Sequence, residues 1–281
     1  MLGEKSVPGP ARRSHDQLRE HYALERELAD RLKRASRSER PDLYPAVYEE
    51  LLRRLAHHPQ RTRCPRRPAV TAQLRVLRPF LSPSCRFLEI GAGDCALALS
   101  VAPHVGEVHA VEVSSEVTKG FDATINLTLH HTRGIDIPLP DGSIDLAYSY
   151  QLMEHLHPED AFEQLRELAR VLTPGGAYLC VTPNRLSGPH DISRYFERVA
   201  SGLHLHEYTV GELAELFAEA GFSKFSVRRV VRSRSVSIPA GPIAAFERLL
   251  EPLPWPLRSR VARAEPIARA LEIFALGHKA A

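Results

Sequence analysis

Apolar residues in the second half of the chain recur with two different periods. Short apolar runs bounded by turn residues predict four strands, at residues 85–90, 107–113, 144–150 and 176–183. Between the last two runs, apolar positions at helical spacing predict a helix over residues 158–172 with one apolar face, formed by Ala161, Leu165, Leu168, Ala169 and Leu172. This alternation predicts an α/β fold in which helices cover both faces of a parallel sheet.

Helices are predicted before the sheet, and further elements after it. The first helix starts from Ser14, a good capping residue, and two more are expected at residues 42–57 and 70–81. After the sheet we expect a helix at 209–221, a strand at 222–233 and a last strand at 270–279. The predicted organisation is a disordered tail (1–13), an N-terminal helical segment (14–82) and one α/β domain (83–281) with a helical insert (239–269).

Composition places the chain among ordinary soluble proteins. Of its 281 residues, 43% are hydrophobic and 25% are charged. The sequence contains neither an apolar run long enough for a membrane span nor the apolar core of a signal peptide. The four cysteines, Cys64, Cys85, Cys95 and Cys180, form no C-x-x-C pair. We therefore expect a reduced, cytoplasmic protein without a structural zinc site.

The formal net charge of +3 conceals an acidic middle between two basic ends. Alternating Arg and Glu along predicted helices indicate solvated helix faces, and the basic ends also suit an anionic substrate or peripheral contact with a phospholipid surface. The basic cluster at residues 61–68 has no interleaved aromatic residues, so the sequence does not favour a nucleic-acid partner. The pattern makes no prediction of the oligomeric state.

Polar residues interrupt one apolar run, FLEIGAGDCALAL (residues 87–99). A strand that ends at Ile90 and a helix that starts near Cys95 leave a turn at Gly91 and Gly93, where glycine permits close approach of a ligand to the backbone. The segment fits G-x-G-x-x-A, and Glu112 follows its first glycine by 21 residues. This spacing suits an adenosine-containing ligand, dinucleotides included.

Two acidic residues narrow the class of ligand. Glu89 precedes the first glycine by two residues, where a carboxylate can hold the amino group of an amino acid. Glu112 can accept hydrogen bonds from both hydroxyls of a ribose. No Gly-Lys-Ser/Thr sequence follows the turn, and the acids would repel a phosphate. The turn therefore favours a ligand with a cationic amino-acid end and a free ribose.

Four segments together resemble the class I S-adenosylmethionine-dependent methyltransferases. They are LEIGAGDC (88–95), VEV (111–113), IPLPDGSIDLAYSYQLMEHL (137–156) and LARVLTPGGAYLCVTPNR (168–185). The order after Phe87 is similar to a bacterial group with EHLHP, TPNRLSGPHDISRYF and HLHEYT segments, related to the ubiquinone/menaquinone-type enzymes. The resemblance implies a Rossmann-like, seven-stranded sheet with an antiparallel last strand, and S-adenosylmethionine as cofactor.

The resemblance also implies roles for individual residues. Those on the methionine side of the cofactor are Glu89, Gly91, Ala92, Gly93 and Asp94. Glu112, followed by Val113, would bind the ribose, and Asp136 is the candidate for the adenine contact. Tyr150 and Gln151, at the end of the fourth strand, would face the sulfonium, whose charge an aromatic ring can favour.

Histidines are the candidate bases for methyl transfer to a protonated acceptor such as a hydroxyl. His155 follows the fourth strand, and His190 lies in GPHDIS. His155 could equally cap or pack the following helix. The ubiquinone-type enzymes carry E-x-x-E-H here, but Gln151 replaces the first acid, so no metal is expected. The segment 204–207, with His190 and Asp191, could in principle bind zinc or manganese.

The expected activity is O-methylation of a small-molecule, lipid or glycan-like acceptor. N- or C-methylation is the nearest alternative. A nucleotide-dependent oxidoreductase and a non-catalytic cofactor-binding module are the alternatives from other classes. Nothing in the sequence identifies the methyl acceptor.

Overall fold

A computed structural model describes residues 13–56, 67–119, 121, 125–231 and 234–281. Most of the predicted N-terminal tail, and the Pro- and Arg-rich stretch that contains Cys64, lie outside the described residues. No helix in these described ranges is both long and apolar enough to cross a membrane.

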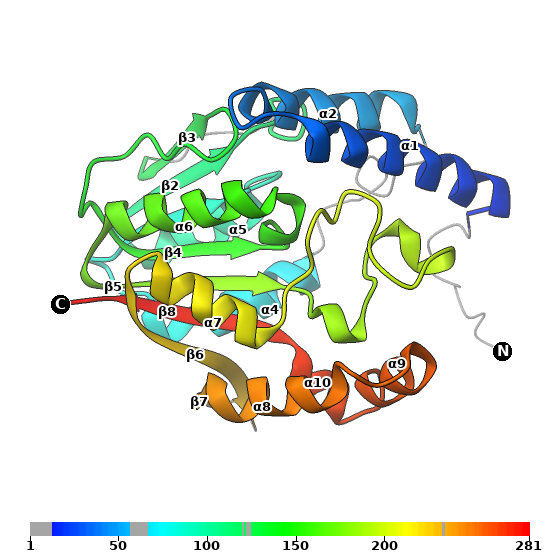
Figure 1. Ribbon diagram of the computed structural model, residues 1–281. Coiled ribbons are helices and arrows are strands. Elements are labelled where there is room, and N and C mark those ends of the chain that lie inside the picture. Colours follow the sequence, from blue (N-terminus) through cyan, green and yellow to red (C-terminus); the bar gives the residue numbers. More distant parts are fainter. Residues whose placement is uncertain (1–12, 57–66, 120, 122–124, 232–233) are drawn as a thin grey trace, which may run out of the picture.

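A single mixed sheet forms the centre of the fold (Figure 1), in the order β3-β2-β1-β4-β5-β8-β6-β7. Its strands are β1 (Arg86–Ile90), β2 (Glu107–Glu112), β3 (Leu127–His131), β4 (Ile144–Tyr150), β5 (Leu172–Thr182), β6 (Phe222–Val231), β7 (Arg234–Pro239) and β8 (Ile273–Lys279). The first five pair in parallel, and β8 lies between β5 and β6, antiparallel to both. The predicted antiparallel last strand is thus confirmed.

The expectation of seven strands was wrong by one, because β7 adds an eighth. It pairs with β6 in an antiparallel hairpin, from Ser226 opposite Pro239 to Val231 opposite Arg234. The sequence analysis predicts no strand between the strand at 222–233 and the insert at 239–269. Arg, Ser and Pro alternate there with only two apolar residues, which is the pattern of a short edge strand and not of a buried one.

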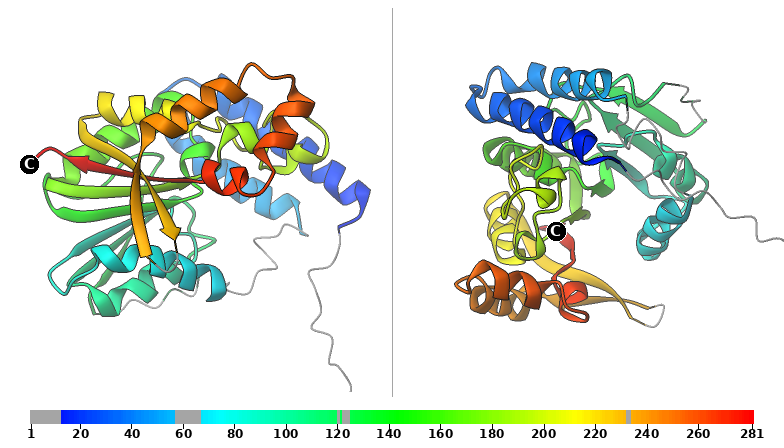
Figure 2. Two further views of the ribbon diagram at one scale, coloured as in Figure 1. Left: turned by 90° about the horizontal axis from the view of Figure 1, so that it is seen from below. Right: turned by 90° about the vertical axis from the view of Figure 1, so that its right-hand side faces the viewer.

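Helices cover both faces of the sheet (Figures 1 and 2). On one face lie α1 (His15–Arg34), α2 (Arg40–Arg54), α6 (Pro158–Val171) and α7 (Val210–Glu219), and on the other α4 (Arg67–Leu77) and α5 (Ala96–Val101). Side chains along β1 point alternately to the two faces of the sheet. Leu88 and Ile90 therefore pack in the apolar cluster on one face, and Phe87 packs in the cluster on the other. The central strands are therefore buried on both faces, as their apolar sequence predicts.

Capping residues set several helix ends. Ser14 caps α1 in a capping box with Gln17, as the sequence predicts. The second helix begins at Arg40, two residues earlier than expected, with Pro41 in its first turn. The third ends at Leu77, because Pro79 continues it as the 3₁₀ turn η1 (Arg78–Phe80).

A buried ion pair attaches the N-terminal helices to the sheet layer. The Arg40 guanidinium donates to both carboxylate oxygens of Asp160 on α6, at 2.6 and 2.9 Å, and the Tyr44 hydroxyl donates to the same carboxylate. Arg40 and Asp160 are 2% and 3% exposed. Because each charge has a hydrogen-bonded partner, this contact fixes α2 on α6.

The insert between β7 and β8 is helical, with α8 (Ala240–Leu250), α9 (Trp255–Ala262) and α10 (Ile267–Leu271). Its apolar residues form a small cluster with Leu186. The buried carboxylate of Glu247 on α8 accepts hydrogen bonds from the Asn184 side chain and from the N–H groups of Val210 and Gly211. The insert therefore holds the chain that follows β5, which forms part of the site.

Candidate functional site

The predicted glycine turn lies between β1 and α5. Gly91 and Gly93 have φ values of +68° and +55°, and Cys95 also lies in the left-handed region at 58°. A Cβ on Gly91 would approach the Leu152 side chain to 3.1 Å, whereas a Cβ on Gly93 would meet no atom within 4 Å. The turn is thus packed at Gly91 and open at Gly93.

Glu112 lies beside this turn, at the end of the adjacent strand β2. One oxygen, Oε2, accepts the N–H of Gly93 at 2.8 Å, and Oε1 accepts the N–H groups of Val113 and Ser114 at 2.9 and 3.0 Å. The residue is 9% exposed. The backbone therefore fixes the carboxylate between two parallel strands, at their carboxyl ends, where open α/β sheets bind ligands.

Glu89 brings a second carboxyl group, with one unpaired oxygen, to the same place. It is 5% exposed, and its Oε2 is buried with no hydrogen-bond partner among the described residues. Burial raises the pKa of Glu89 to about 8; the Ala98 N–H opposes this rise, and the negative charges of Asp94 and Glu112 add to it. A buried acid of this kind suits a ligand that brings a hydrogen-bond donor or a positive charge.

The other residues predicted to contact the cofactor differ in burial and in their hydrogen bonds. Ala92 is buried in the turn, and Asp94 Oδ1 accepts the N–H of Ala96 in the first turn of α5. Asp136 lies exposed in the loop between β3 and β4, and its adenine contact stays a prediction.

Tyr150 and Gln151 end β4 next to the turn. Tyr150 is 44% exposed, and Gln151 has a φ of 53°, which is uncommon for a residue with a side chain. The Gln151 N–H donates to the Val181 carbonyl at 2.8 Å, which holds this conformation. Leu152, which contacts Gly91, follows directly, so the end of β4 touches the glycine turn.

A pocket of about 760 Å³ is lined in part by Tyr150 and Gln151. Its walls come from the end of β5, the segment that follows it, the insert and the start of β8. The polar lining residues include Asn184, Ser187, His190, Arg194, Tyr195 and Glu272. The volume is within the range of small-molecule sites.

His190 is the only one of the two predicted bases that lines this described pocket. Its backbone N–H donates to Glu207 Oε1 at 2.7 Å, and its ring Nδ1 lies 3.3 Å from Glu207 Oε2. Ser187 Oγ lies 3.3 Å from Nε2. Burial opposes ionisation of Glu207, but hydrogen bonds from His190 and His204 hold its pKa at about 2. A permanently charged carboxylate thus orients the imidazole.

His155 lies outside the pocket lining, beneath the N-terminal helices. Its Nδ1 donates to the Leu203 carbonyl at 2.9 Å, and its ring makes edge contacts with Tyr48 and His204. Burial, together with the nearby His204, lowers the pKa of His155 to about 3. The ring is therefore neutral at physiological pH, and among the described residues its contacts are with Leu203, Tyr48 and His204 and not with the helix that follows it.

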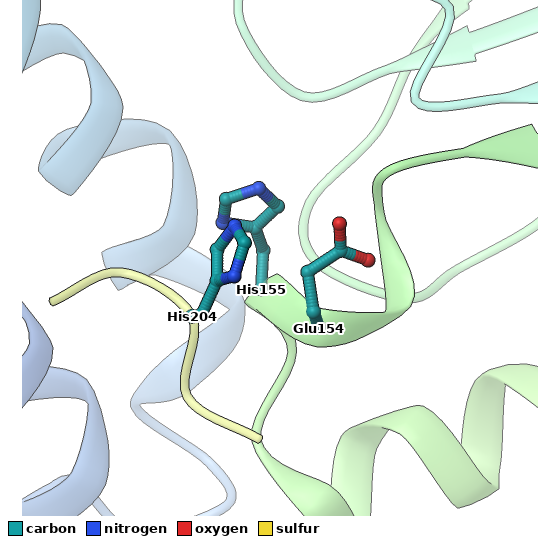
Figure 3. Close-up of side chains that lie close together, drawn as sticks. All are labelled: Glu154, His155 and His204. Atoms are coloured by element: carbon teal, nitrogen blue, oxygen red, sulfur yellow. The ribbon is translucent and has the colours of Figure 1, made fainter. Parts of the chain in front are cut away.

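A cluster of Glu154, His155 and His204 was not predicted from the sequence (Figure 3). Figure 3 shows Glu154 and His155 on the 3₁₀ turn η3 (Met153–His155) and His204 on a separate segment of chain. Burial raises the pKa of Glu154 to about 7, with the positive charge of His204 opposing it. Burial also opposes protonation of His204, but its bond to Glu207 raises the pKa of His204 above the usual value.

The metal set that the sequence left open is brought together only in part: His190 and His204 both contact Glu207, whereas Asp191 has other partners. The Asp191 carboxylate accepts hydrogen bonds from Ser193 and from the Gly202 N–H, and so closes a loop. Within the described ranges, Glu154, His155 and His204 are the only group of this kind whose candidate ligand atoms converge. The E-H and H-x-H pairs were visible in the sequence, but their proximity depends on a fold of the 185–209 segment that local pattern does not predict.

Comparisons with known proteins agree with this geometry. Residues 88–180 match the family model of a methyltransferase domain. A probable S-adenosylmethionine-dependent methyltransferase of Mycolicibacterium smegmatis is 36% identical over 94 residues, which are 34% of this chain and 34% of that protein. Another from Mycobacterium tuberculosis is 27% identical over 221 residues, covering 73% of this chain and 76% of that protein. Residues 88–180 thus form a methyltransferase domain, and the chain is similar to S-adenosylmethionine-dependent methyltransferases.

The solved structures support the fold of this methyltransferase. A chain of the Haloferax volcanii complex between the Trm112 methyltransferase activator and a methyltransferase superposes with a TM-score of 0.54, at 19% identity. The superposition covers 75% of this chain and 90% of that chain. The cofactor of the enzyme is S-adenosylmethionine. The open backbone at Gly93, the fixed Glu112 carboxylate and the unpaired Glu89 oxygen fit its ribose and amino-acid end.

Proposed function

We propose that this enzyme transfers a methyl group to the hydroxyl oxygen of a small molecule that binds in the 760 Å³ pocket, with His190 as the general base. The observation that carries the proposal is a histidine in the pocket wall, oriented by a buried carboxylate. A hydroxyl needs a base because its oxygen must lose a proton as it is methylated. Many nitrogen acceptors need no base, because a neutral nitrogen has a lone pair that is nucleophilic enough to react directly.

The cofactor side of the site consists, in this proposal, of Glu89, Gly91, Gly93 and Glu112. Glu112 would accept a hydrogen bond from a ribose hydroxyl with the one lone pair of Oε2 that the backbone leaves free, and Glu89 would accept from the amino group. Bound S-adenosylmethionine supplies an electrophilic methyl group. Tyr150 and Gln151 line the pocket, and the next residue, Leu152, lies against Gly91, which supports an acceptor site close to the cofactor.

His190 would hold the acceptor hydroxyl and take its proton. With Nδ1–H donated to Glu207, Nε2 carries the lone pair that can accept a hydrogen bond from the hydroxyl. The Glu207 carboxylate then stabilises the imidazolium that forms. Alignment of the hydroxyl oxygen with the methyl group and the sulfur can contribute about 7–11 kcal/mol to catalysis. Positioning of the acceptor by the pocket residues around His190 therefore matters as much as proton removal by His190.

A metabolite comparison tests this function. Cells that lack the protein are complemented with the wild type, Glu112→Ala or His190→Ala, and extracts are searched for a compound that gains one CH₂ unit only with the wild type. We expect an O-methylated small molecule that disappears with both variants. An N- or C-methylated product, a methylated lipid or glycan, or full product with His190→Ala would contradict the proposal.

A further inference from the structure

The Glu154, His155 and His204 cluster has the donor set of a metal site (Figure 3). One candidate ligand atom from each residue lies within 4.8 Å of the others. Zinc bonds of about 2.0–2.2 Å keep the ligands of one ion within about 4 Å of each other, so small side-chain rotations close the site. Two imidazoles and one carboxylate are donors that suit zinc, manganese or ferrous iron.

Hydrogen bonds already orient both imidazoles for such a role. His155 Nδ1 is bonded to the Leu203 carbonyl, and His204 Nδ1 lies 2.8 Å from Glu207 Oε1. These bonds fix the tautomer in which Nε2 of each ring carries the lone pair. Metal-binding histidines commonly donate their other N–H to a carboxylate or a backbone carbonyl in this way.

Glu154 supplies an independent observation that points to a ligand. The residue is 0% exposed, its Oε2 accepts the Thr182 hydroxyl at 2.9 Å, and its Oε1 has no partner in the described part of the chain. An unpaired, fully buried carboxylate oxygen is costly. A cation between Oε1 and the two imidazoles would remove that cost.

The surrounding charges also favour a cation. Three further buried carboxylates, of Glu25, Asp191 and Glu207, lie near the cluster. The hydrogen bonds that they accept come from histidine rings, one serine side chain and backbone N–H groups. In the described part of the chain, none of these hydrogen bonds comes from a lysine or arginine side chain.

We propose that Glu154, His155 and His204 bind one divalent transition-metal ion, with zinc as the expected occupant. The ion joins η3 to the segment that carries Glu207. Because His204 and His190 both contact Glu207, the site is connected to the pocket wall through hydrogen bonds. Three protein ligands leave one position for water or another small donor. The proposal is separate from the function of His190 and holds whatever the acceptor is.

Binding of zinc alone to the full chain tests the proposal. The protein is stripped with a chelator, dialysed and titrated with ZnCl₂ by calorimetry, and mass spectrometry of the metal gives the stoichiometry. We expect one equivalent, with Glu154→Gln and His204→Gln each weakening binding at least about 10- to 100-fold. The matched control is His206→Gln, which removes a histidine two residues from His204 and should bind like the wild type.

Two further measurements distinguish this site from zinc held by cysteines and from a loss of folding in the variants. Cobalt bound in place of zinc should give an absorption spectrum typical of nitrogen and oxygen ligands. The absence of thiolate bands would exclude the cysteines as ligands of the ion. Circular dichroism and S-adenosylmethionine affinity show whether each variant is folded. Substoichiometric zinc, thiolate bands, or equal binding by folded Glu154→Gln and wild-type protein would overturn the proposal.

Discussion

The two sides of the proposed site are built in different ways. On the cofactor side, Glu89, Gly91 and Gly93 come from one short stretch, and Glu112 joins them from the adjacent strand through backbone hydrogen bonds. On the pocket side, the walls come from three stretches that lie far apart in sequence, 150–151, 181–195 and 263–274, the last of which includes the end of the insert. Local backbone geometry thus makes the cofactor side, whereas tertiary packing makes the pocket.

This difference implies that substitutions on the two sides should have separable effects. Changes at the turn should alter cofactor affinity, and changes at the pocket wall should alter the rate of transfer. Contact between the two sides occurs where Leu152 meets Gly91. A substitution on one side that alters the property of the other would show that the two sides act as one unit.

His190→Ala should have the largest effect. Loss of a general base slows transfer to a hydroxyl about 10²- to 10⁴-fold, while the affinity for S-adenosylmethionine stays unchanged. Formation of S-adenosylhomocysteine with the identified acceptor measures the rate, and calorimetry measures the affinity. His206→Gln, outside the pocket lining, should retain the wild-type rate. A His190→Ala enzyme at half the wild-type rate or better would remove His190 from the chemistry.

Glu112→Ala should weaken S-adenosylmethionine binding by about 10- to 150-fold, because charge-assisted hydrogen bonds contribute about 1.5–3 kcal/mol. The matched control is Glu107→Ala. This residue begins the same strand, half-exposed at its other end, and should leave the affinity unchanged. Calorimetric titration compares the two variants. Equal affinities would mean that the cofactor does not contact the carboxyl end of β2.

The same division explains how far the sequence could predict the molecule. The glycine turn was predictable because left-handed φ values require glycine, and Glu112 because its spacing from the turn matches one crossover to the next strand. The orientation of His190 by Glu207 was not predictable from the sequence, because it depends on contacts between residues that lie far apart in the chain. Arg263, for example, donates to the carbonyls of Ser187 and Gly188 and so holds that loop.

The eighth strand and the cluster of Glu154, His155 and His204 were missed for related reasons. An edge strand with polar alternation gives no apolar run, so β7 resembled a connection. The E-H pair after β4 and the H-x-H pair at 204–206 are each unremarkable, and only the packing of η3 against the later segment joins them. Local pattern therefore predicts elements and turns, but not which polar side chains meet across 50 residues.

Glu89 should make the stability of the cofactor-free protein depend on pH. Its folded pKa of about 8 is raised above the unfolded value, so the folded state binds the extra proton and stability is lost as pH rises from about 4.5 to 8. The slope is at most about 1.4 kcal/mol per pH unit. Urea unfolding at several pH values should show this slope in the wild type and a flatter one in Glu89→Gln. Saturating S-adenosylmethionine should also flatten the slope of the wild type. Identical slopes in the wild type and Glu89→Gln would contradict the raised pKa of the buried Glu89 carboxyl group.

Gly91→Ala and Gly93→Ala should show the smallest effects and the clearest contrast. Both place a Cβ in the left-handed region, which costs roughly 1–2 kcal/mol. At Gly91 the new atom also meets Leu152 at 3.1 Å, so urea unfolding should show a larger loss of stability for Gly91→Ala. At Gly93 the Cβ enters open space, so that variant should lose cofactor affinity with only the strain cost in stability. If Gly93→Ala bound S-adenosylmethionine as tightly as the wild type, the cofactor would not lie against the open face of the turn. The proposed contact between Glu112 and the ribose would then be contradicted as well.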